Sequence, residues 1–221
     1  MDLFGRSWAA LRAAVDGLAE EDFAEPSGCA GWLVRDLVCH LVIDAQDVLI
    51  TLVTPSPAEP TRDAASYWQV SAEPPDGQDP LDALTVRLAA AYGDPGLLRL
   101  HLDDVGSAAG RAAELADPRL RVATQGQVLT AGDYLDAYVL EWTLHHLDLV
   151  AHLPHLPGPP AEGLAGARRL LERIAGGAFP ASFADADALL VGTGRRVATP
   201  AERTALGAHG APGTKVPLVL G

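Results

Sequence analysis

Cysteine, aromatic residues and long apolar runs are all scarce in this chain. Only two cysteines, Cys29 and Cys39, occur among 221 residues, and aromatic residues make up 5%. Two cysteines cannot supply the disulfide framework of a small secreted protein, so we expect a reduced, cytoplasmic protein. Charged residues interrupt every apolar stretch before the roughly 18 residues of a membrane span, and the first residues lack the basic start and apolar run of a secretion signal. The sequence therefore predicts neither a membrane-spanning helix nor a secretion signal.

Basic residues are outnumbered by acidic ones. The chain has 16 Lys and Arg residues against 29 Asp and Glu residues, a formal net charge of −13. Such a charge repels phosphate backbones and anionic lipid heads, so we expect no nucleic acid and no membrane as partners. Hydrophobic residues at 48% and charged residues at 20% are typical of a folded globular protein. The length suits one compact unit with an appendage, as a monomer or a homodimer.

Apolar residues recur at three- and four-residue steps along most of the chain, which predicts helices. The segments with this pattern are 3–23, 32–53, 80–92, 130–152 and 161–175, with more helix expected up to residue 116. Thr130 and Asp133 have the spacing of a capping box, which marks a helix start. Two short apolar runs bounded by glycine and proline, 187–194 and 215–221, favour strands. We therefore predict a mainly α protein: a four-helix bundle over 1–155, a proline-rich connector, and a small C-terminal α/β appendage over 161–221.

The helix predicted over 130–152 carries a stripe of ionisable residues. Glu141, His145, Asp148 and His152 follow one another at steps of four, three and four, so they share one face. Apolar residues occupy most of the remaining surface, which indicates a helix buried nearly all round. A buried carboxylate must be paired, protonated or bound to a cation. Glu141 and His145 lie one turn apart, which suits two ligands of one metal ion, or a simple pair that bind each other.

A second stripe lies on the helix predicted over 32–53. Asp36, His40, Asp44 and Asp47 follow one another at steps of four, four and three. If this stripe faces the first one across the bundle, His40 joins Glu141 and His145 as a third metal ligand and leaves a position open, as in catalytic divalent sites.

Aspartates beside these histidines are candidates to orient their rings. Asp36 or Asp44 could accept a hydrogen bond from the second ring nitrogen of His40, and Asp148 could do the same for His145. The alternative for these aspartates is a solvated helix face.

Two motifs together resemble a known family. They are the run SGCAGWLVRDLVCHL over 27–41 and the pattern Tyr-Leu-x-x-Tyr-x-x-Glu-x-x-x-His-His-x-Asp-Leu over 134–149. They closely resemble the mycothiol-dependent maleylpyruvate isomerases, which belong to the DinB-like superfamily of metal-binding four-helix bundles. The resemblance covers roughly residues 1–155, and the GTGR and AERxxLG segments look like C-terminal tails of the same family.

The resemblance implies a DinB-like bundle with a divalent metal, usually zinc, held by His40, Glu141 and His145. It also implies mycothiol as cofactor, with its sulfur at the open metal position as a nucleophilic thiolate. Isomerisation or S-transfer on a small electrophilic substrate would begin with that thiolate. The alternative is a non-catalytic bundle that binds a small molecule or holds a structural metal. A structural site would be closed by a fourth protein ligand such as Asp44.

The chain departs from the family pattern at two positions. Leu33 stands where members usually have Thr or Ser as a helix cap, so the cap must come from elsewhere, at a cost of about 1 kcal/mol. Tyr138 stands where members often have an arginine, one turn before the motif glutamate. If that arginine binds a substrate carboxylate in relatives, its replacement disfavours a dicarboxylate such as maleylpyruvate. Tyr138 and Trp142, near the ligands, suggest a less acidic and more aromatic substrate.

Three further residues are weaker candidates. Arg87 on the third predicted helix could contact an anionic group of cofactor or substrate, or form a surface ion pair. Cys29 and Cys39 could be a redox pair, but buried free thiols fit their ten-residue spacing better.

Overall fold

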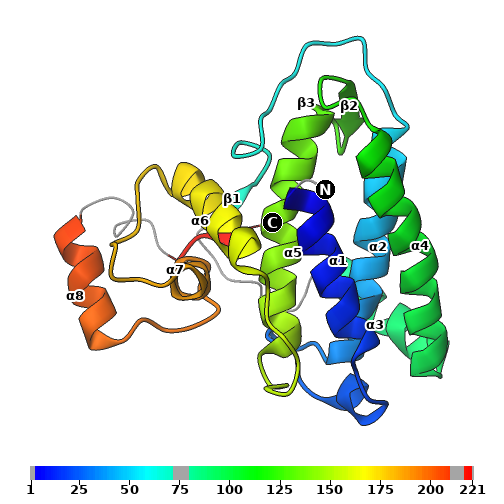
Figure 1. Cartoon of the computed structure of the whole chain (residues 1–221), viewed down its shortest axis with the longest axis horizontal. Helices are drawn as coiled ribbons and strands as arrows, with labels where there is room; N and C mark the ends of the chain where they lie inside the picture. Colours follow the sequence, from blue (N-terminus) through cyan, green and yellow to red (C-terminus); the bar gives the residue numbers. More distant parts are fainter. Residues whose placement is uncertain (1–2, 72–79, 210–216, 221) are drawn as a thin grey trace.

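Four helices that pack side by side form the body of the protein (Figure 1). The computed structural model describes residues 3–71, 80–209 and 217–220. The helices of the bundle are α1 (Leu3–Asp16), α2 (Val34–Leu52), α4 (Pro95–Leu115) and α5 (Ala131–Val150). A further helix, α3 (Pro80–Tyr92), lies mainly against α2. The predicted mainly α fold with a helical bundle is thereby confirmed.

The first predicted helix has a different limit in the structure, whereas the helix predicted over 80–92 and the further helix expected up to residue 116 are both present. The first helix ends at Asp16 instead of residue 23, and a short 3-10 helix, η1 (Glu21–Ala24), follows. Its Asp22 carboxylate accepts a hydrogen bond from the N–H of Ala19, which fixes the turn between the two. The region 80–116 contains two helices, because Gly93 has a φ of +66° and Asp94 caps α4 by accepting from the N–H of Gly96. The bundle member is the second of these helices.

A short hairpin that the sequence pattern did not predict leads into α5. Strands β2 (Arg121–Thr124) and β3 (Gln127–Thr130) are antiparallel, and both turn residues, Gln125 and Gly126, have positive φ. This conformation matches the right-handed twist of two strands. Thr130 then caps α5 by accepting from the N–H of Asp133, as predicted.

The C-terminal region is mostly helical and packs on the bundle. It contains α6 (Ala161–Ala175), α7 (Asp185–Gly192) and α8 (Pro200–His209). The strand predicted over 187–194 is wrong, because this segment lies in α7 and the turn that follows it. A short apolar run does not distinguish a strand from a buried helix, and Asp185 and Asp187 in the first turn favour a helix.

The second predicted strand is partly present. Residues 217–220 include β4 (Val219–Leu220), which pairs with β1 (Val70–Ser71) in the loop between α2 and α3, whereas residues 215, 216 and 221 lie outside the described residues. This pairing connects the C-terminus to the bundle loops.

Two apolar clusters meet at α5. In the first, Trp8 of α1 stacks on Trp142 of α5 with ring centroids 4.1 Å apart. In the second, Leu140 and Leu144 of α5 pack with side chains of the C-terminal region such as Leu171. Helix α5 is therefore buried on both sides, and the C-terminal region shares a core with the bundle.

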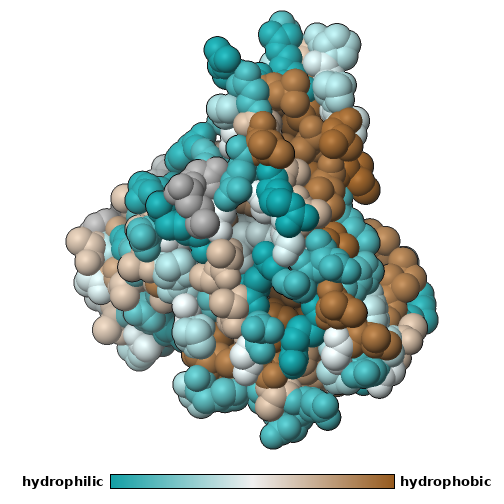
Figure 2. Space-filling view, turned by 45° about the vertical axis from the view of Figure 1, so that its right-hand side comes forward, coloured by the Kyte–Doolittle hydropathy of each residue, from teal (hydrophilic) through white to brown (hydrophobic). Residues whose placement is uncertain are grey.

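The surface is mixed. On the face shown in Figure 2, hydrophilic residues surround apolar areas at the upper end and on the lower right. Exposed apolar side chains include Ile50 and Val53 at the end of α2 and Leu115 at the end of α4. Among the described residues, none of the helices combines the length and apolarity that crossing a bilayer requires.

The contact between α1 and α4 gives a paired test of packing. A Cβ at Gly106 would lie 2.7 Å from Trp8 Cζ2, whereas a Cβ at Gly110, one turn later, would lie 3.6 Å from Trp8 Cδ1, an ordinary contact. We expect Gly106→Ala to lower the free energy of unfolding by about 1–3 kcal/mol through overpacking. Gly110→Ala should raise it by about 0.5–1 kcal/mol, because alanine favours the helix. Urea unfolding measures both, and equal effects would contradict the packing described.

Candidate metal centre

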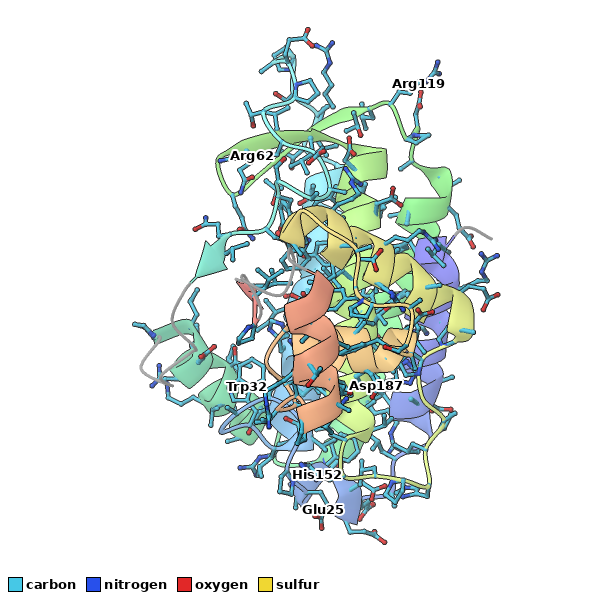
Figure 3. All side chains as sticks on the ribbon, turned by 90° about the vertical axis from the view of Figure 1, so that its left-hand side faces the viewer. Glu25, Trp32, Arg62, Arg119, His152 and Asp187 are labelled. Atoms are coloured by element: carbon cyan, nitrogen blue, oxygen red, sulfur yellow. The ribbon has the colours of Figure 1, made fainter. Side chains whose placement is uncertain are left out.

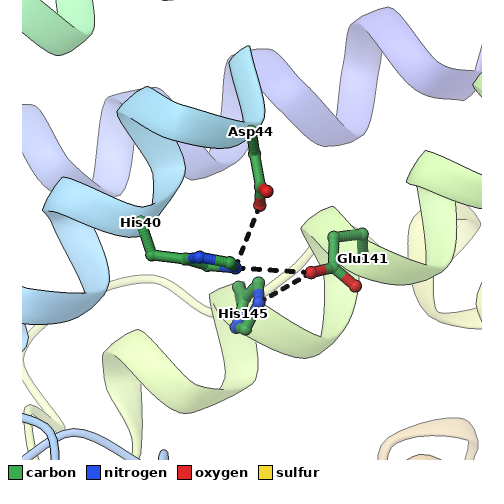
Figure 4. A group of neighbouring side chains, drawn as sticks. All are labelled: His40, Asp44, Glu141 and His145. Atoms are coloured by element: carbon green, nitrogen blue, oxygen red, sulfur yellow. Dashed lines mark hydrogen bonds and ion pairs between the residues drawn. The ribbon is translucent and has the colours of Figure 1, made fainter. Parts of the chain in front are cut away.

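The two ionisable stripes face each other across the bundle. His40 and Asp44 of α2 lie opposite Glu141 and His145 of α5 (Figure 4). Oε1 of Glu141 is 2.9 Å from Nε2 of His145 and 3.6 Å from Nε2 of His40. Nε2 of His40 is 3.2 Å from Oδ2 of Asp44. One potential ligand atom from each residue lies within 4.8 Å of all the others.

Solvent reaches this cluster. The side chains of His40 and Glu141 are 24% and 19% exposed, whereas those of Asp44 and His145 are 12% and 10% exposed. Trp32, labelled in Figure 3, comes just before α2. Its ring lies edge-on to that of His40, with centroids 5.2 Å apart. Solvent therefore reaches the cluster from the side of His40 and Glu141.

The charges in the cluster depend on one another. Burial alone would raise the pKa of Glu141, but the charges and hydrogen bonds of His145 and His40 outweigh burial and hold that pKa below its usual range. Burial alone would lower the pKa of His145, but the carboxylates of Glu141 and Asp148 raise it well above its usual value. Glu141 and Asp148 thus stabilise the protonated, positively charged form of the His145 imidazole. A metal cation could supply the same positive charge at this position.

Asp44 supports a cation at this position. Burial raises its pKa to about 6, in spite of the neighbouring imidazole of His40. Its Oδ2 is buried and has no hydrogen-bond partner, because the approach of His40 is close but not in hydrogen-bond geometry. A buried oxygen without a donor beside two imidazoles and a second carboxylate is the donor set of a zinc-type divalent site. The residues present therefore fit such a metal.

The other ring nitrogen of His145 is held by a chain of polar groups. Nδ1 lies 3.2 Å from Oδ2 of Asp148. Arg195 donates to Asp148 from Nε, at 2.9 Å to Oδ1, and from Nη2, at 3.0 Å to Oδ2. Burial alone would raise the pKa of Asp148, but His145 and Arg195 lower it to about 2. Asp148 therefore stays charged and fixes the orientation of the His145 ring.

The loop before α2 closes on this chain. The N–H of Gly28 donates to the carbonyl of Asp148 at 2.8 Å, and a Cβ at Gly28 would lie 2.8 Å from Cα of Asp148. Only glycine permits this approach. Sγ of Cys29 consequently lies 3.3 Å from Oδ2 of Asp148 and 3.8 Å from Nδ1 of His145.

The two cysteines are free thiols. Burial raises the pKa of Cys29, and it raises that of Cys39 to about 11. The structure thus gives no support to a redox pair.

Other predicted site residues have different positions. Asp36 accepts from the N–H of Leu33 at 2.9 Å, which is one half of a capping box, and its other oxygen has no hydrogen-bond partner, so it does not orient His40. The side chain of Leu33 supplies no cap. Trp142 is fully buried against Trp8, a position that does not favour its predicted substrate contact. Arg87 is exposed on α3, and its anion contact remains a prediction.

Tyr138 lies beside the cluster, and so does Arg195, whose role the sequence pattern did not predict. The Tyr138 hydroxyl donates to Asp47, and Tyr134 donates to the same oxygen. Arg195 belongs to the GTGR segment, which forms the turn after α7, with a φ of +77° at Gly194. No local pattern connects Arg195 to a helix 47 residues earlier in the chain.

The comparisons with known proteins agree with this geometry. The family model described as the mycothiol maleylpyruvate isomerase N-terminal domain matches residues 4–150. A search of the curated proteins found no match, and neither did a search of the solved structures. The match covers the bundle and both stripes of the cluster. The chain therefore belongs to the mycothiol maleylpyruvate isomerase family.

Proposed function

We propose that this protein is a metal-dependent enzyme that uses mycothiol to isomerise a small electrophilic substrate or to transfer the thiol to it. The observation that carries the proposal is the cluster of His40, Asp44, Glu141 and His145, within 4.8 Å and open to solvent at His40 and Glu141. Family membership supports the choice of thiol.

His40, Glu141 and His145 would hold the metal, with zinc favoured by two imidazoles and a carboxylate. A bound divalent cation lowers the pKa of a thiol beside it and thereby supplies a nucleophile at neutral pH. The partial exposure of His40 and Glu141 supports the approach of a thiol from that side.

The remaining residues of the site have supporting roles. Asp148 holds Nδ1 of His145, so that Nε2 points into the cluster. Arg195 holds both oxygens of Asp148 and thereby connects the C-terminal region to the metal centre. Trp32 forms an aromatic wall beside His40, suited to a flat substrate.

A specific observation favours a second candidate, a bundle with a structural metal. Oδ2 of Asp44 belongs to the cluster and has no hydrogen-bond partner. As a fourth protein ligand it would close the coordination shell and leave no position for a thiol. Thiol binding separates the two candidates.

The first experiment compares metal and thiol binding in wild type and His40→Ala. We expect about one zinc per wild-type chain by mass spectrometry, and mycothiol binding in calorimetry only when zinc is bound. His40→Ala should lose both, because a ligand is missing.

His155→Ala is the control, since this histidine pairs with Asp22 away from the cluster, and it should keep both. Metal-free wild type excludes both candidates, whereas zinc without thiol binding favours the structural one.

The second experiment tests the arginine from the C-terminal region. Arg195→Gln should weaken zinc binding about 10- to 100-fold, because Asp148 loses the partner that keeps it aligned on His145. Arg196→Gln is a matched control, as Arg196 pairs with Asp187 and Glu202 instead. Competition with a chromophoric chelator measures the affinity, and equal affinities in the two variants would refute the role of Arg195.

The third experiment concerns the substrate. Tyr138 replaces an arginine that many members carry, and its hydroxyl is bound to Asp47, so a dicarboxylate lacks that cationic partner. We expect kcat/KM for maleylpyruvate to be below about 10⁴ M⁻¹s⁻¹, which is the lower end of the usual range for enzymes acting on their own substrates. A higher value would show that maleylpyruvate is a true substrate.

A further inference from the structure

A carboxylate that accepts hydrogen bonds from two tyrosine hydroxyls lies next to the metal centre. Asp47 is three residues beyond Asp44 on α2, and its Oδ2 accepts from the hydroxyls of Tyr134 at 2.8 Å and Tyr138 at 2.9 Å. Tyr138 is in turn three residues before Glu141 on α5. The pair of helices that holds the metal ligands therefore also holds this carboxylate.

The two tyrosines that hold Asp47 are buried and packed against each other. Tyr134 and Tyr138 are 0% and 5% exposed, and their ring centroids lie 4.8 Å apart. Burial raises the pKa of both phenols, so they remain hydrogen-bond donors at neutral pH. Because both donate to Oδ2, the acceptor sites of Oδ1 are left for another donor, and within residues 3–71, 80–209 and 217–220 no donor to Oδ1 is found.

The surroundings are acidic. In the described part of the chain, Asp47 forms no ion pair with an arginine. Arg195, the arginine near the metal centre, is paired with Asp148 on the other side of His145. The pKa of Tyr67, whose ring lies 6.0 Å from that of Tyr134, is raised by burial and then by the carboxylates of Asp47, Glu141 and Asp44. Among these carboxylates, the buried Oδ2 of Asp44 lacks a donor.

The spacing suits one extended ligand. At 1.5 Å of rise per residue, Asp47 lies about 4.5 Å beyond Asp44 and about 10 Å beyond His40 along α2. Two linked amide units span about 7 Å. A cysteinyl thiol with its sulfur at the cluster can therefore bring a group joined through its amide to Asp47.

We propose that Asp47, held by Tyr134 and Tyr138, is a specificity-determining residue that binds hydroxyl groups of the thiol cofactor beyond its cysteinyl part. This inference rests on the proposed function. A free carboxylate oxygen binds hydroxyl or ammonium donors through charge-assisted hydrogen bonds and repels carboxylates. The subsite therefore selects a thiol that carries a polyol over a simple acidic thiol.

The test titrates two thiols into the zinc-loaded full-length chain. Mycothiol carries its cysteinyl sulfur on an amide-linked polyol, and N-acetylcysteine has the sulfur without the polyol. We expect Asp47→Asn, which keeps the shape, to weaken mycothiol binding about tenfold or more and not to weaken the binding of N-acetylcysteine, whose own carboxylate Asp47 repels in the wild type. Asp104→Asn, which removes an equal charge from the exposed face of α4, should behave as wild type.

Zinc content and thermal unfolding of each variant accompany the titrations. Equal weakening for both thiols, no weakening for either, or loss of zinc from Asp47→Asn overturns the inference. If the wild type binds zinc but neither thiol, the proposed function itself is refuted. If the wild type binds both thiols, only the inference on Asp47 is being tested by the variants. If Asp47→Asn does not fold, Tyr138→Phe removes one brace, and the same selective weakening of mycothiol is expected from it, whereas unchanged affinity overturns the inference.

Discussion

The need to compensate two carboxylates on α5, one buried and one partly buried, governs the whole arrangement. Glu141 and Asp148 lie on a helix that packs against α1 on one side and α6 on the other. An uncompensated buried charge costs several kcal/mol, so each must find a cationic or hydrogen-bonding partner. Glu141 finds His145 and His40, while Asp148 finds His145 and Arg195. The cluster follows from this pairing, and a divalent ion satisfies the same charges.

Both the bundle and the C-terminal region contribute residues to this site. Facing helices α2 and α5 supply the four potential ligands, and the turn after α7 supplies Arg195. The shared core around Leu140 and Leu144 fixes the distance between the two parts. The orientation of His145 thus depends on packing far from the metal ligands along the chain.

Helix periodicity predicted some of this correctly and some of it wrongly, for identifiable reasons. Residues spaced by three or four share a face, so Glu141 and His145 had to be neighbours. The same rule placed Asp36 and Asp44 on one stripe, but a shared face does not tell that the N–H of Leu33 binds the carboxylate of Asp36. Trp142 was close in sequence to the ligands, yet 100° of rotation turns it into the core.

The sequence by itself determined the helical bundle, the stripes of ligands and the family, because these depend on local periodicity and on motifs within single helices. Only the tertiary structure decided that the stripes face each other, that Asp44 joins the cluster, and that Arg195 and Asp47 flank it. These contacts join segments far apart in the chain, and their formation depends on how apolar faces pack. Local patterns say which face of a helix is apolar but not which helix will cover it.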